Sequence, residues 1–170
     1  MAKTGTTPLW IRTTILAGAA LFTFALIVSA IYEPGIRVLH TLQALIYVLV
    51  VILSFRGSPW GFGAGCTIAA FWNYINLFVT TFIRNGAEQF VTLFQTGTLA
   101  RPDVALGAVA GAGHLLLVAA CLAGFLRQRP GSRAWLQFVA GGMIAIAYFV
   151  LIIAVTGPQY LHLLKQAVGL

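Results

Sequence analysis

Residues 60–83 read WGFGAGCTIAAFWNYINLFVTTFI and contain no charged side chain. A helix of this length is long enough to cross the hydrocarbon core of a bilayer. Steps of three and four residues give the stretch two unlike faces. The bulky face holds Ile68, Phe71, Ile75, Phe78 and Phe82, and the small, polar face holds Gly65, Ala69, Asn73, Asn76 and Thr80. We expect the bulky face to contact lipid and the small, polar face to pack against other helices.

The composition of the whole chain indicates a membrane protein. Of its 170 residues, 60% are hydrophobic and only 8% are charged. A soluble domain carries about 25% charged residues. The apolar runs are long and continuous, whereas a transmembrane β-barrel needs many short alternating strands. We therefore predict an all-α polytopic membrane protein, a compact bundle of five transmembrane helices forming a single domain over residues 1–170.

Hydrophobic runs and turn residues set the expected boundaries. The predicted spans are residues 13–32, 37–55, 60–83, 104–126 and 134–156. A short amphipathic helix, residues 86–96, is expected to lie in the membrane interface between the third and fourth spans. Asn85 and Glu88 have the spacing of a capping box at its start.

The net charge of +7 comes from basic residues at the ends of apolar runs. Topology and anionic lipid headgroups account for such charges, so we expect the lipid bilayer and no nucleic acid as a partner. The distribution of Lys and Arg favours a cytoplasmic N-terminus and an external C-terminus. We expect a cell-membrane location, the bacterial inner membrane.

Small residues recur at helix-packing spacing in three of the spans. They are Gly61 and Gly65, Gly107 and Gly111, and Gly141 and Ala145. Such pairs let two helix backbones approach closely. Self-association or packing against other transmembrane proteins is therefore expected.

Five polar side chains are expected deep in the membrane: His40, Gln43, Asn73, Asn76 and His114. Their estimated depths place them in the outer half of the bundle, where they can converge. One interpretation is hydrogen bonding between helices, and another is a small-molecule cavity or solute path. A third is a b-type haem between His40 and His114. Their depths differ by about 9 Å, whereas axial nitrogens on one iron lie ~4 Å apart, which disfavours the haem.

Standard catalytic and nucleotide-binding signatures are missing from the sequence. No metal site and no catalytic residue is predicted, no cofactor is strongly implied, and an enzyme is not expected. The leading hypothesis is a non-catalytic subunit or scaffold that packs against other transmembrane helices, lipid or pigment in a membrane complex. The alternative is a small-molecule binder or transporter that uses the polar cluster. A haem electron-transfer subunit and a lipid-acting enzyme with His114 as base are further alternatives.

Overall fold

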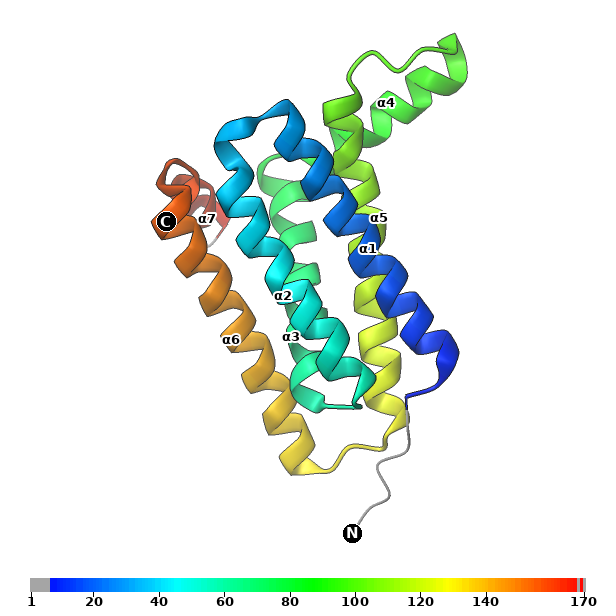
Figure 1. The fold of residues 1–170 in the computed structure, drawn as a ribbon, viewed down its shortest axis with the longest axis vertical. Coiled ribbons are helices and arrows are strands. Elements are labelled where there is room, and N and C mark those ends of the chain that lie inside the picture. The colour runs from blue at the N-terminus through cyan, green and yellow to red at the C-terminus, as the bar shows by residue number, and fades with distance from the viewer. Residues whose placement is uncertain (1–6, 168, 170) are drawn as a thin grey trace.

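A computed structural model describes residues 7–167 and 169 of the chain. Five of its helices are long and apolar enough to cross a membrane, as predicted. These are α1 (Leu9–Tyr32), α2 (Arg37–Phe55, after the 3-10 turn η1, Pro34–Ile36), α3 (Pro59–Tyr74, continued by the π-helix η2, Ile75–Val79), α5 (Pro102–Arg127) and α6 (Ser132–Thr156). The shorter elements are α4 (Phe82–Thr96), the 3-10 turn η3 (Pro158–Tyr160) and α7 (Leu161–Ala167). The described residues contain no strand, and this architecture is that of an integral membrane protein (Figure 1).

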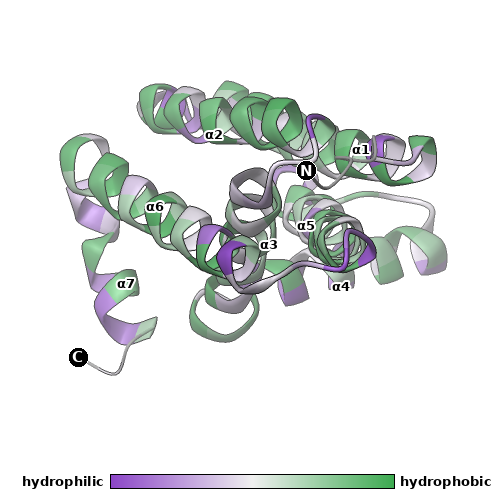
Figure 2. Ribbon diagram, turned by 90° about the horizontal axis from the view of Figure 1, so that it is seen from below, coloured by the Kyte–Doolittle hydropathy of each residue, from purple (hydrophilic) through white to green (hydrophobic). Residues whose placement is uncertain are grey.

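Helix α3 lies inside the arrangement, with contacts to α2, α5 and α6 (Figure 2). Helix α1 packs along α5 and α2. The prediction that the bulky face of residues 60–83 meets lipid is therefore wrong for Ile68 and Ile75, which are buried. Only Phe78 of that face is largely exposed, at 68%. The reason is that neighbours surround α3 on several sides, so both of its faces are packed.

Glycine allows α3 and α6 to cross with their backbones in contact. A Cβ atom added at Gly63 would overlap the carbonyl oxygen of Phe138, and one added at Gly141 would overlap that of Trp60. The other predicted packing positions also have neighbours within the chain: Gly61 meets Leu53 and Ser54, Gly65 meets Val50 and Cys121, Gly107 meets Phe82, Gly111 meets Ile83, and Ala145 is buried. These small residues are thus occupied by the protein's own helices.

The third span ends earlier than predicted, at Val79 and not at residue 83. The amide of Thr80 bonds to the carbonyl of Ile75, five residues back, and Thr81 adopts a left-handed conformation with φ 57°. Helix α4 then begins at Phe82, four residues before the predicted start. The capping box at Asn85 is therefore wrong, because Asn85 already lies inside the helix.

The remaining boundaries agree closely with the prediction, except that α1 begins four residues early, at Leu9 directly after Pro8. Helix α4 packs against the first turns of α5 and projects sideways from the long helices (Figure 1). It ends at Thr96, where Gly97 takes a left-handed conformation. After α6, the chain folds back through η3 and α7 at the end where α1 meets α2 (Figure 1).

Candidate functional site

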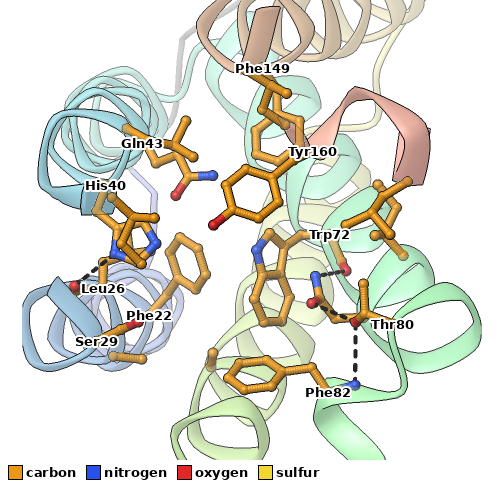
Figure 3. A pocket seen from close by; sticks show the side chains of 18 of the residues that line it. Phe22, Leu26, Ser29, His40, Gln43, Trp72, Thr80, Phe82, Phe149 and Tyr160 are labelled. Carbon is orange, nitrogen blue, oxygen red and sulfur yellow. Dashed lines mark hydrogen bonds between the residues drawn. The ribbon is translucent and has the colours of Figure 1, made fainter. Parts of the chain in front are cut away.

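A cavity of about 350 Å³ opens at the end of the molecule that carries the α1–α2 turn and α7 (Figure 3). Its walls come from α1, α2, α3 with η2, α5, α6 and the C-terminal segment. Apolar side chains such as Phe22, Leu39 and Phe149 make most of the lining. The volume lies at the small end of the range for small-molecule sites. The cavity is therefore large enough for a small ligand.

The structure divides the predicted polar cluster into two groups. His40, Gln43 and Asn76 line the cavity, whereas Asn73 and His114 do not. The five side chains therefore do not converge on one site.

Gln43 is the most distinctive polar group of the cavity. Its side chain is almost fully buried, at 6% exposure. Its Oε1 atom has no hydrogen-bond partner within the described part of the chain. An unsatisfied buried amide costs about 1–3 kcal/mol, so such groups in native proteins call for an explanation. A ligand that displaces the side chain covering this oxygen and hydrogen-bonds to it provides one.

His40 links α2 to α1 through one ring nitrogen and offers the other ring nitrogen as a hydrogen-bond acceptor. Its Nδ1 atom lies 3.0 Å from the carbonyl oxygen of Leu26. Because a carbonyl only accepts, we assign the proton to Nδ1. In the neutral ring, Nε2 is then a hydrogen-bond acceptor. His40 thus combines a structural bond with an acceptor in the cavity wall.

Asn76 supports the cavity wall rather than offering free groups to a ligand. Its Nδ2 donates to the carbonyl of Trp72 at 3.0 Å, and its Oδ1 accepts from the hydroxyl of Thr80 at 3.0 Å. The Thr80 hydroxyl oxygen in turn accepts from the amide of Phe82 at 3.3 Å. These bonds fix the π-helix and the start of α4. Next to them stands Thr81, a β-branched residue at positive φ, a combination that is an outlier in proteins.

Tyr160 and Glu33 complete the mouth of the cavity, and neither was among the predicted site residues. The Tyr160 hydroxyl donates to Glu33 Oε1 at 3.4 Å, and its ring lies between Gln43 and Trp72 in Figure 3. Burial raises the pKa of the Tyr160 phenol, and the negative charge of Glu33 raises it further. The phenol therefore remains a protonated donor at neutral pH. The sequence does contain a clue to Glu33 as a site residue, since it is one of only three acidic residues and ends an apolar run.

His114 is fully buried behind the cavity and has a packing role. Its Nε2 lies 2.7 Å from the hydroxyl oxygen of Tyr47, which joins α5 to α2. The rings of Phe22 and Trp72, which line the cavity, pack against the imidazole with centroids 4.0 and 4.8 Å away. Asn73 also links two helices, since its Nδ2 donates to the carbonyl of Gly111 at 3.3 Å.

The b-type haem between His40 and His114 does not fit this arrangement. The two residues share no cavity, because Phe22 and Trp72 cover the His114 ring. The Nε2 atom that would bind iron faces Tyr47 instead.

Residues 7–167 and 169 bring together no group of three or more His, Cys, Asp or Glu side chains with the spacing of a metal site. A scan against protein-family models and searches of curated proteins and of solved structures find no match to this chain.

Proposed function

We propose that the protein is a non-catalytic membrane protein that binds a small amphipathic molecule in the cavity lined by Gln43 and His40. The observation that carries this proposal is the unpaired, buried Oε1 of Gln43 in a wall that is otherwise mostly apolar. Small-molecule sites have this composition: apolar and aromatic walls with a few convergent polar groups that orient the ligand.

The backbone around the cavity supports the same function. The π-helix η2 and the strained Thr81 lie along one wall, next to the lining residues Thr80 and Phe82. Single π-helical turns and unfavourable backbone conformations occur frequently at functional sites.

The test uses a variant in which Trp72 is the only indole, made by changing Trp10, Trp60 and Trp135 to Phe. Each of those three side chains is at least partly exposed, at 55%, 38% and 43%. Short alkyl probes with a brominated tail quench indole fluorescence on contact. Three probes carry the same decyl tail and differ only in the head group, which is an amine, an alcohol or a carboxylate.

We expect at least one probe to quench Trp72 saturably, and Gln43→Leu to weaken its binding about tenfold, since one hydrogen bond contributes roughly 1 kcal/mol or slightly more. The matched control is Gln95→Leu, which removes an exposed amide from α4. Quenching that rises linearly with all three probes, without saturation, would refute the binding function.

A subunit or scaffold in a membrane complex is the second candidate function. The glycine pairs that favoured it are filled by the protein's own helices, which weakens that argument. Its support now comes from α4, where Phe94 and Val91 are exposed outside the five long helices. Purification in a mild detergent distinguishes the two, because a protein that always runs alone as a monomer is not such a subunit.

We also propose a bacterial inner membrane as the location, with the N-terminus in the cytoplasm and α4 in the outer interface. Support comes from the Lys and Arg distribution. A membrane-impermeant maleimide should label Ala100→Cys but not Gly131→Cys in intact cells. Both positions are exposed, whereas the native Cys66 and Cys121 lie within spans. The reverse labelling pattern would invert the topology.

A further inference from the structure

We infer that the ligand of this cavity is a cationic amphipath, a small amine whose ammonium group lies at the mouth beside Glu33 and whose apolar tail fills the interior. This inference rests on the proposed binding function and specifies its ligand class.

The charge of the lining is the first argument. Glu33 is the only charged residue among those described residues that line the cavity, and no Lys or Arg lines it. Arg37, which follows the turn after Glu33, directs its Nε to the carbonyl of Ala30 at 3.1 Å instead. Lys165 adjoins Leu164 in α7 but is not part of the lining. The charge at the mouth therefore favours a cation and disfavours a carboxylate or phosphate.

The hydrogen-bonding groups near Glu33 give the second argument. Leu26 and Ser29 lie on one face of the last turns of α1, and Glu33, which caps that helix, lines the same cavity. The bond to the Leu26 carbonyl places the His40 ring beside this face. Glu33, the Nε2 of a neutral His40 and the Oε1 of Gln43, three residues after His40 on α2, are acceptors, and a serine hydroxyl can accept as well. An ammonium group has three donors and no acceptor, so it matches this set.

The aromatic side chains at the mouth give the third argument. Tyr160, Trp72 and Phe82 all line the cavity, and Figure 3 shows the Tyr160 and Trp72 rings among its lining side chains. The faces of aromatic rings attract cations, and ammonium groups are commonly recognised in this way.

The three probes with matched tails test this inference. Glu33 is exposed, so the preference is expected to be moderate: the amine should bind Trp72-only protein about fivefold more tightly than the alcohol, and the carboxylate most weakly. Glu33→Gln should bring the amine to the affinity that the alcohol shows in the same variant. Glu88→Gln is the matched control, because it removes the same charge from exposed α4 and leaves the cavity lining intact.

The outcomes distinguish a failure of this inference from a failure of the function on which it rests. If the alcohol saturates and the amine binds no more tightly, the cationic ligand is wrong and the binding function stands. If Glu88→Gln removes the preference as fully as Glu33→Gln does, the preference comes from the surface potential and the inference fails. If no probe saturates, both proposals fail. If Glu33→Gln does not fold, a salt titration of the protein with Glu33 intact takes its place. The preference for the amine over the alcohol must then shrink as ionic strength rises, and a constant preference overturns the inference.

Discussion

Replacing Ile68 by alanine tests the central position of α3, on which the cavity depends. Ile68 is completely buried, although its sequence pattern predicts contact with lipid. In soluble proteins, Ile→Ala in a core costs about 2–5 kcal/mol. Part of that cost is the lost free energy of transferring the side chain out of water, about 0.8 kcal/mol for each of the three carbons that the substitution removes. In a bilayer the transfer contribution is lost, because lipid is as apolar as the protein interior. What remains is the packing contribution, roughly 0–2.5 kcal/mol.

The measurement is an SDS titration in mild-detergent micelles, with unfolding followed by circular dichroism. Ile144→Ala is the matched control, because the Ile144 side chain of α6 is 60% exposed and has few protein neighbours. It should change the free energy of unfolding by less than about 0.5 kcal/mol, the usual limit for surface substitutions. An equal or larger cost at Ile144 than at Ile68 would show that α3 is not enclosed as described.

Three further changes test other parts of the structure by the same titration. Gly63→Ala should destabilise by about 1–3 kcal/mol, because its methyl group overlaps a carbonyl of α6, whereas Gly35→Ala meets no atom within 4 Å and should be near neutral. Tyr47→Phe should destabilise by about 1–3 kcal/mol, because it removes the hydroxyl that bonds to His114. The same substitution should cost less in a protein that already carries His114→Leu, and if the costs of the two substitutions simply add, the bond is excluded. Thr81→Gly should be neutral or stabilising by up to about 1 kcal/mol, since glycine adopts positive φ without strain, and a clear loss would contradict the left-handed backbone.

The five long helices were predictable because hydropathy is a local property of each run. The rotation of α3 about its axis was not, and Ile68 shows why. In a soluble protein a bulky side chain seeks the interior, but here lipid and interior are equally apolar, so bulk does not distinguish them. Small residues were the better guide: Gly65 and Ala69 are buried as their pattern predicts.

The candidate site was only partly predictable. Depth follows from residue count, and it placed His40, Gln43 and Asn76 near the end where the cavity lies. Depth does not give direction, so His114 was grouped with them although Trp72 separates it from the cavity. Tyr160 reaches the site only because the chain reverses after α6, and no periodicity in the sequence encodes that contact.

The enclosed position of α3 has a consequence for how the protein is made. The third span, α3 with η2, is the least apolar of the five and carries two amides, so it enters a bilayer on its own less favourably than the others. Its neighbours α5 and α6 leave the ribosome after it. At a synthesis rate of roughly 5–20 residues per second, α3 waits for several seconds before these partners exist. During that interval the amide of Asn73 has no Gly111 carbonyl to bind, so a nascent chain arrested before α5 should be held at the insertion machinery or degraded.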